Sequence, residues 1–165
     1  MSSSVIEQPI PRSLRQKLRP WLPTFLWLCL IAVCSSDQFS AAHTRGILWK
    51  IFHAIFPGLT HDSFEVIHHF IRKSAHFVFY GILSWLAFRS WRATLSKRAA
   101  WTFQWSGLAL ALTLAAATLD EFHQAFVPSR TSSPYDVLLD MMGAVFFQVL
   151  IASFSNFAID RRLRG

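Results

Sequence analysis

The sequence predicts an all-α integral membrane protein with four transmembrane helices and an outer interfacial amphipathic helix. Of its 165 residues, 53% are hydrophobic and only 15% are charged, which is too apolar for a soluble domain of this size. Four apolar stretches approach the ~20 residues that a helix needs to cross the hydrocarbon core of a bilayer. These stretches are 20–36, 75–91, 99–119 and 137–158.

One membrane domain is expected over 20–158, with cytoplasmic basic tails at 1–19 and 159–165. The first tail is polar and contains Ser and Pro, a composition typical of disordered segments. Because the first apolar stretch is short, it needs tilt or local bilayer thinning to span. A basic stretch, an apolar run and small residues near 32–36 also describe a signal peptide, which stays an alternative.

The Lys and Arg residues place both termini in the cytoplasm, because cytoplasmic loops retain positive charge. Four precede the first span, four separate the second from the third and three follow the fourth, which is eleven of the sixteen. Residues 37–73 and 120–136 are then outer loops of a multi-pass protein in the cytoplasmic (inner) membrane. Topology and anionic lipid thus explain the net charge of +7, and no nucleic-acid partner is expected.

An amphipathic helix is expected after the first span. Apolar residues recur at helical spacing over 47–56, while Lys50 and His53 occupy the opposite side. This pattern is typical of a helix that lies flat at a membrane interface, here the outer leaflet. Pro57 and Gly58 end it.

The second span is expected to belong to one long helix. Asp62 and Glu65 resemble a capping box, and a helix over 63–91 would be about 43 Å long, so its first turns should stand above the bilayer. Small residues in the third span allow close approach in lipid and predict that this span is the central helix. The last helix should begin with Ser133 as its N-cap.

Ionisable residues gather at the outer ends of three predicted helices, where charge near lipid is expensive and usually functional. Lys73, His76 and Tyr80 follow one another at steps of three and four and therefore share a helix face. Asp140 lies more than one turn inside a span and needs a partner, for which Lys73, His76 and Arg130 are candidates. The remaining members of the cluster are Asp120, Glu121, Gln124 and Asp136.

This cluster fits a structural ion-pair network, an active site or a recognition pocket. For catalysis, His76 would be a general base oriented by Glu121 or Asp120. For ligand binding, cations would hold a phosphate or an oxyanion. The candidate binding residues are Lys73, Tyr80, Gln124, Arg130, Asp136 and Asp140. No spaced metal-ligand motif occurs, so no metal site is predicted, and the sequence identifies no cofactor.

The order and spacing of these residues resemble the VanZ-like family of small bacterial membrane proteins, over about 31–154. The motifs are Lys73-x-x-His76-x-x-x-Tyr80, Asp120-Glu121-x-x-Gln124-x-Phe126-x-Pro128-x-Arg130 and Asp136-x-x-x-Asp140-x-x-Gly143-Ala144. Ser129 stands where the family often has Gly, and Asp140 where it often has Asn. The resemblance implies a four-helix or similar membrane domain, and the founding member is associated with resistance to the glycopeptide teicoplanin.

The leading hypothesis is an outer pocket that binds an anionic, lipid-linked cell-envelope component, with Lys73 and Arg130 as the cations. The expected partners are membrane lipid and a lipid-linked cell-wall precursor. The alternative is a membrane-embedded hydrolase or transferase that uses His76 with Glu121 or Asp120. A transporter is disfavoured, because four short spans in one chain would need to oligomerise.

Overall fold

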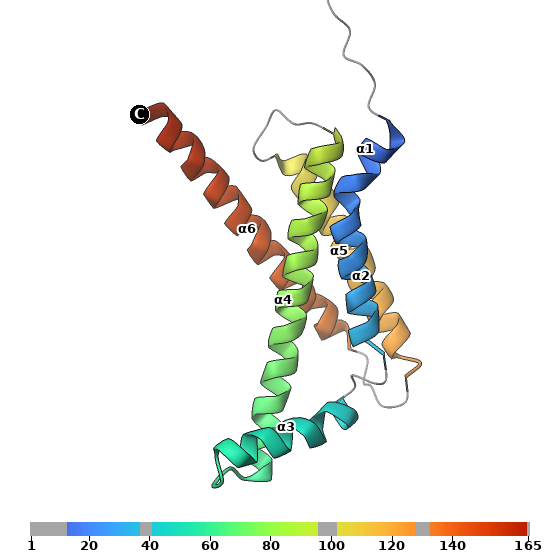
Figure 1. Ribbon diagram of the computed structural model, residues 1–165, viewed down its shortest axis with the longest axis vertical. Helices are drawn as coiled ribbons and strands as arrows, with labels where there is room; N and C mark the ends of the chain where they lie inside the picture. The colour runs from blue at the N-terminus through green and yellow to red at the C-terminus, as the bar shows by residue number, and fades with distance from the viewer. Residues whose placement is uncertain (1–12, 37–40, 96–101, 128–132, 165) are drawn as a thin grey trace, which may run out of the picture.

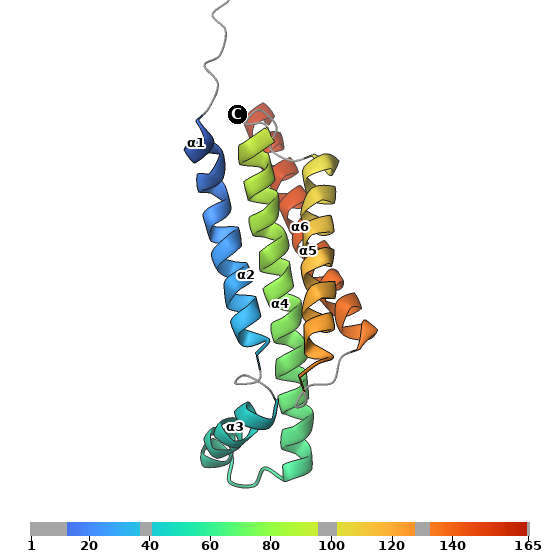
Figure 2. The ribbon, with the colours of Figure 1, turned by 90° about the vertical axis from the view of Figure 1, so that its right-hand side faces the viewer.

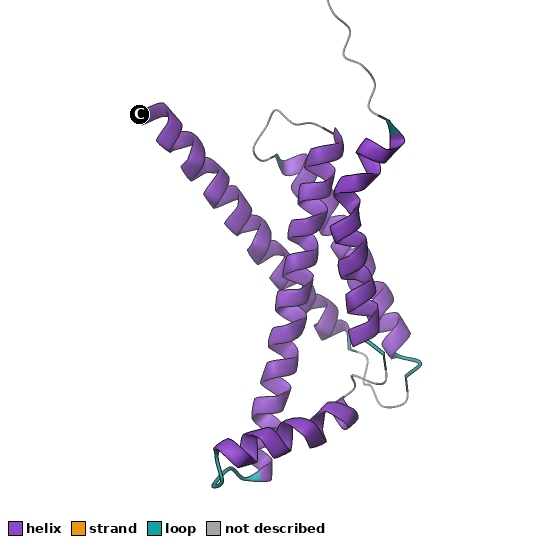
Figure 3. Cartoon of the chain, viewed as in Figure 1, coloured by secondary structure: helices purple, strands orange, loops and turns teal. Residues whose placement is uncertain are grey.

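The computed structural model describes residues 13–36, 41–95, 102–127 and 133–164. Secondary structure in these residues is helical throughout, without a strand, which confirms the all-α prediction (Figure 3). The elements in chain order are α1 (Leu14–Leu18), the 3-10 helix η1 (Arg19–Trp21), α2 (Leu22–Cys34), α3 (Ala41–Ile55), α4 (His61–Leu95), α5 (Phe103–Gln124) and α6 (Pro134–Arg164).

Two helical stretches are long and apolar enough to cross a membrane, Leu14–Cys34 and Pro134–Ser155. They contain most of the first and fourth predicted spans and are consistent with a membrane protein. It stays a prediction that α4 and α5 also cross the membrane. The first helix begins at Leu14 and the last helix ends at Arg164. Helical structure therefore extends into both segments that the sequence assigns to the tails.

The central helix is α4, and the expectation that the third span holds this place is wrong. It packs against α2, α5 and α6 along its length and against α3 near its first residue (Figures 1 and 2). With 35 residues, α4 is about 52 Å long at the usual helical rise. Its first turns therefore extend past the neighbouring helices, and α3 lies across them (Figure 1).

The start of α4 differs from the predicted capping box. Thr60 Oγ1 accepts a hydrogen bond from the backbone N–H of Ser63 at 3.3 Å, so Thr60 supplies the cap that Asp62 was expected to supply. Glu65 does not close the box, because its carboxylate pairs with Arg45 of α3 at 3.0 Å. Glu65, the second carboxylate of the expected capping box, therefore binds α3 and does not cap its own helix. At the other predicted start, α6 begins directly after Ser133 as expected.

Helices α4 and α6 run in the same direction and cross (Figure 1), and one glycine of each helix lies at the contact. A Cβ atom added at Gly143 would clash with the backbone carbonyl of Phe77, and one at Gly81 would clash with the ring of Phe147. Small residues allow such approach in lipid, where close packing must replace the hydrophobic effect as the force between helices. The glycines thus fix the register of α6 on α4.

A buried amide joins three helices just beyond this crossing, toward the C-terminal ends of α4 and α6. The side-chain nitrogen of Gln148 donates to the hydroxyl and the carbonyl of Ser84 at 2.8 and 3.0 Å, and its oxygen accepts from Ser106 at 2.9 Å. All three residues are buried. Interhelical hydrogen bonds of this kind each contribute about 0.6 to 2 kcal/mol in membranes. The clamp connects α4, α5 and α6 at one level.

The first helix is held by polar contacts with α4. Thr24 and Ser90 share a buried hydroxyl hydrogen bond of 2.9 Å, and Trp27 Nε1 donates to the carbonyl oxygen of Phe79 at 2.9 Å. Trp21 Nε1 donates to Thr94 at 3.0 Å. These contacts give α2 a place in the folded bundle.

The crossing predicts that Gly143→Ala destabilises the protein by about 1 to 3 kcal/mol, because the added methyl group overpacks a contact with backbone. Gly107→Ala is the matched control, since nothing lies within 4 Å of a Cβ atom at that position. Thermal unfolding in detergent, followed by circular dichroism, measures both. Equal melting temperatures for the two variants would contradict the close crossing.

Candidate functional site

The two ends of the bundle differ in charge. Basic residues of α1 and η1 lie beside the last turns of α4, which carry Arg89 and Arg92, and the chain ends on the same side (Figures 1 and 2). The polar residues singled out from the sequence lie at the opposite end, where α5 ends and α6 begins. The fold therefore places the basic segments and the candidate site at opposite ends, as the predicted topology requires.

The stripe predicted on α4 exists, and each of its members meets a carboxylate of another helix. Lys73 forms an ion pair with Asp136, at the start of α6. One turn further, His76 Nδ1 lies 3.2 Å from Asp140 Oδ1. These contacts give Asp140 the partner that its place inside a span demands.

The third rung of this ladder connects α4 to α5. The hydroxyl of Tyr80 donates to Asp120 Oδ2 at 2.9 Å, and Gln124 Nε2 donates to the same oxygen at 2.9 Å. Tyr80 and Gln124 are buried at 1% and 2% exposure, so both donors lie in a dry environment. Asp120 is held by neutral donors and has no cation paired with it among the described residues.

Glu121 joins α5 to the start of α6. Its Oε2 accepts the backbone N–H of Ser133 at 2.9 Å. Its Oε1, like Oδ2 of Asp140, is buried without a hydrogen-bond partner among the described residues. Such an oxygen costs about 1 to 3 kcal/mol when left unsatisfied. Both oxygens can therefore accept a further hydrogen bond.

The structure thus brings most of the predicted site residues together but pairs them differently. His76 contacts Asp140, whereas Asp120 and Glu121, its expected partners, are engaged by Tyr80, Gln124 and Ser133. Lys73 is neutralised by Asp136. Arg130 lies outside the described residues.

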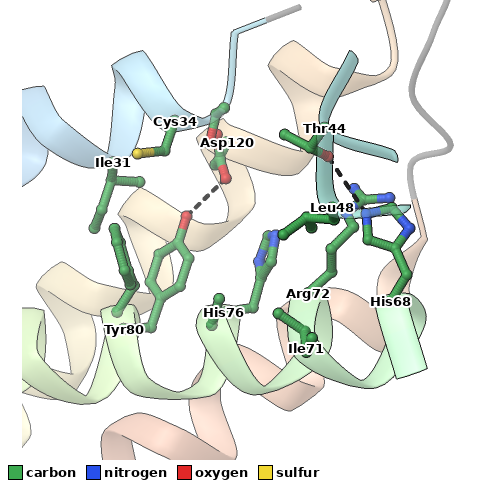
Figure 4. A pocket seen from close by; sticks show the side chains of 13 residues that line it. Ile31, Cys34, Thr44, Leu48, His68, Ile71, Arg72, His76, Tyr80 and Asp120 are labelled. Carbon is green, nitrogen blue, oxygen red and sulfur yellow. Dashed lines mark hydrogen bonds between the residues drawn. The ribbon is translucent and has the colours of Figure 1, made fainter. Parts of the chain in front are cut away.

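A cavity of about 240 Å³ lies between α4 and the facing parts of α2, α3 and α5. Figure 4 shows it with His76 and Tyr80 on the side of α4, Asp120 of α5 facing Tyr80, and Thr44 and Leu48 of α3 at one end. Most of its surface is apolar, including Ile31, Leu48, Ile71 and Phe79. The polar lining consists of Ser35, Thr44, His68, Arg72, His76, Tyr80 and Asp120.

Arg72 and His68 line this cavity although the sequence analysis did not single them out. His68, Arg72 and His76 stand four residues apart, so the helical spacing that identified the neighbouring stripe also contains this one. Arg72 extends from α4 toward α3 (Figure 4). Among the described residues, no carboxylate pairs with it.

Helix α3 covers one side of the cavity and is fastened to the first turns of α4. Trp49 stacks on His61 with ring centroids 3.8 Å apart and meets Phe64 edge-on at 5.2 Å. Thr44 Oγ1 lies 3.4 Å from His68 Nε2, a hydrogen bond at the edge of the cavity (Figure 4). The exposed apolar residues Ile47, Ile51 and Ile55 recur every four positions on α3, in agreement with an amphipathic helix.

The protonation state of His68 bears on its hydrogen bond with Thr44 of α3. Burial lowers the pKa of His68, and the positive charge of Arg72 lowers it further, while Glu65 acts in the opposite direction. The neutral ring is therefore favoured in the folded protein. Within the described residues, no three side chains of the types that ligate metals are placed to hold an ion.

A family model described as VanZ/LLP1 matches residues 21–155, which contain all of these contacts. The chain belongs to the VanZ/LLP1 family. This confirms the resemblance seen in the sequence motifs. No curated protein and no solved structure matches the chain.

The lowered pKa of His68 predicts that α3 loosens as the pH falls. Because the native pKa lies below the ordinary value of 6.5, the contact is at full strength above 6.5 and weakens as the detached state takes up a proton. Hydrogen exchange of α3 amides, corrected for intrinsic rates, should increase below 6.5.

His68→Gln is the matched variant, since it keeps a hydrogen-bonding side chain that does not titrate. It should reduce this pH response. His53 and His61, which stack on Trp49, remain in both proteins. An unchanged response in His68→Gln would assign the loosening to those two histidines instead.

Proposed function

We propose that this cavity binds an anionic, lipid-linked component of the cell envelope on the outer side of the cytoplasmic membrane. The observation that carries the proposal is the combination of Arg72 with an apolar cavity at the end of the bundle opposite the basic segments. Under the topology expected from the Lys and Arg distribution, that end faces away from the cytoplasm.

The chemistry of Arg72 suits a phosphate or carboxylate headgroup. A guanidinium presents a planar fork of N–H donors that binds such groups through two parallel hydrogen bonds. Arg72 is half-buried among apolar lining residues, where a charge-assisted bond is stronger than it would be in water. Lys73 was the cation expected from the sequence, but its ion pair with Asp136 makes it a support for the site. Arg130 remains a second candidate on sequence grounds.

The neutral polar side chains would add hydroxyl recognition. When Asp140 is ionised it can only accept, so the contact with His76 places a proton on Nδ1, and in the neutral ring Nε2 is then an acceptor. Asp120 already accepts two hydrogen bonds on one oxygen. A ligand with hydroxyl groups beside its anionic group would match these acceptors and Arg72 together. A link to teicoplanin resistance stays a prediction from the family resemblance.

Replacing Arg72 should therefore remove most of the affinity for an anionic headgroup. Loss of a charge-assisted hydrogen bond costs about 1.5 to 3 kcal/mol, so Arg72→Ala should weaken binding by roughly 10- to 150-fold. The measurement is calorimetric titration of butyl phosphate, a soluble headgroup analogue, into the purified full-length protein. Arg72→Lys should retain part of the affinity, because it keeps the charge and loses the fork.

Arg89→Ala is the control, since Arg89 is an exposed cation on the same helix at the opposite end. It should bind like the native protein. Equal losses in Arg72→Ala and Arg89→Ala would point to general electrostatic attraction and remove the support for a specific pocket.

A second candidate function is hydrolysis or group transfer, and the contact between His76 and Asp140 favours it. A histidine that lines a cavity while a buried carboxylate holds its other nitrogen has the arrangement of an oriented general base. Asp140 would take the orienting role that the sequence analysis gave to Glu121 or Asp120. The base would act on water or on a ligand hydroxyl beside Arg72.

His76→Gln separates catalysis from binding. If the protein is an enzyme, this variant should bind butyl phosphate normally while its turnover falls by about 10²- to 10⁴-fold. Phosphate release from a polyprenyl diphosphate measures turnover, and His69→Gln, on the exposed side of α4, is the control. A native protein that releases no product would end the catalytic candidate and leave the binding proposal intact.

A further inference from the structure

A second cavity, of about 460 Å³, lies between α2 and α5. Its walls are apolar over most of their length and include three alanines that leave space between the helices. The lining residues are Leu28, Ile31, Ala32, Leu112, Ala115, Ala116, Leu119, Asp120 and His123. Ala32, Ala115 and Leu119 are exposed, so this groove opens to the surroundings of the bundle.

The groove lies next to the cavity that contains Arg72, and the two spaces share part of their lining. Ile31 and Asp120 line both spaces, from opposite helices. Asp120 is held on the side of α4 by Tyr80 and by Gln124 of its own helix. A molecule that passes between Ile31 and Asp120 would therefore have one end beside Arg72 and the other between α2 and α5.

Polarity changes along the groove in one direction. Asp120 and His123 line its end near the Arg72 cavity, while Leu28 and Leu112 line its other end. From Leu112 to His123 the groove follows α5 for about 16 Å at the usual helical rise. One leaflet of a bilayer has a hydrocarbon thickness of about 15 Å, which is half of the core. The groove has the length and polarity of a single lipid in the outer leaflet.

We infer that this groove holds the hydrocarbon chain of an anionic lipid whose headgroup occupies the Arg72 cavity. The inference rests on the proposed function and adds the class of ligand: an amphiphile with its anionic group at Arg72 and its chain between α2 and α5. Such a ligand enters sideways from the bilayer and does not need to leave it.

Photolabelling tests the path of the chain. The full-length protein is placed in phosphatidylcholine nanodiscs with octadecyl phosphate that carries a diazirine in mid-chain, and the labelled residues are mapped by mass spectrometry. Label should appear on the groove faces of α2 and α5, and unlabelled octadecyl phosphate should compete it away. A neutral octadecanol probe with the same diazirine should give about tenfold less label if the headgroup contact contributes 1.4 kcal/mol.

Two variants separate the groove from the headgroup site. Ala115→Trp fills an exposed part of the groove wall and should lower the competed label by at least about tenfold, a loss equal to 1.4 kcal/mol. Leu114→Trp, an exposed neighbour outside the groove, should leave labelling unchanged. Binding of butyl phosphate, which has almost no chain, should be unaffected in both.

The failures of the two proposals are distinguishable. Equal labelling by the neutral probe, or labelling that Ala115→Trp does not reduce, would mean that ordinary bilayer lipid occupies the groove and would overturn the inference. Arg72-dependent binding of butyl phosphate would then still support the proposed function. Absence of butyl phosphate binding in the native protein would overturn the proposed function and, with it, this inference.

Discussion

The close crossing of α4 and α6 is the contact on which the site depends. Phe77 meets Gly143 without space for a methyl group, and this places Asp136 and Asp140 opposite Lys73 and His76 on parallel helices. An unpaired carboxylate inside a membrane span costs about 2.5 to 3.5 kcal/mol on insertion scales. The glycine contact and the charge pairs therefore support each other, since each needs the register that the other maintains.

The cavity is built from one rigid wall and one weakly held wall. His76 and Tyr80 belong to the ladder that connects α4 with α5 and α6, so their rings are fixed from behind. Helix α3, on the other side, is attached by a stack on Trp49 and by the pair between Arg45 and Glu65, whose side chains are 54% and 43% exposed. An exposed pair contributes only about 0.2 to 1 kcal/mol. The exposed pair therefore adds little to the ring contacts of Trp49 and the hydrogen bond between Thr44 and His68 that hold α3 on α4.

Much of the site could be predicted from the sequence because helical spacing is local. The steps between Lys73, His76 and Tyr80 place them on one face in any helix, and Asp140 inside an apolar span demands a partner. Of the pairings, the contact between His76 and Asp140 was among the predicted candidates. The others could not be predicted, because the partner of each residue depends on how the helices pack against one another. The prediction of the central helix was wrong for a similar reason. Small residues occur both in α5 and at the crossing of α4 with α6. Only the packing shows that Gly143 of α6 meets the backbone of α4 while Gly107 of α5 does not meet a neighbouring helix so closely. Arg72 shares a stripe of α4 with His68 and His76 that helical spacing contains, but the spacing does not show that α3 packs beside this stripe and completes a cavity there.

The Arg72 cavity would supply the affinity for a lipid, and the groove between α2 and α5 would set the orientation of its chain. Within a bilayer, an apolar groove gains little by binding a hydrocarbon chain, because lipid tails are already as apolar as leucine. The net attraction must then come from the headgroup. There, Arg72 and the acceptors at His76 and Asp120 would bind polar groups that water would otherwise solvate. The groove between α2 and α5 would instead restrict how a lipid can approach, since its polar end lies next to the Arg72 cavity, with Ile31 and Asp120 in both linings. Under the proposed function, such a site would select ligands by the headgroup and would accept chains of various structures.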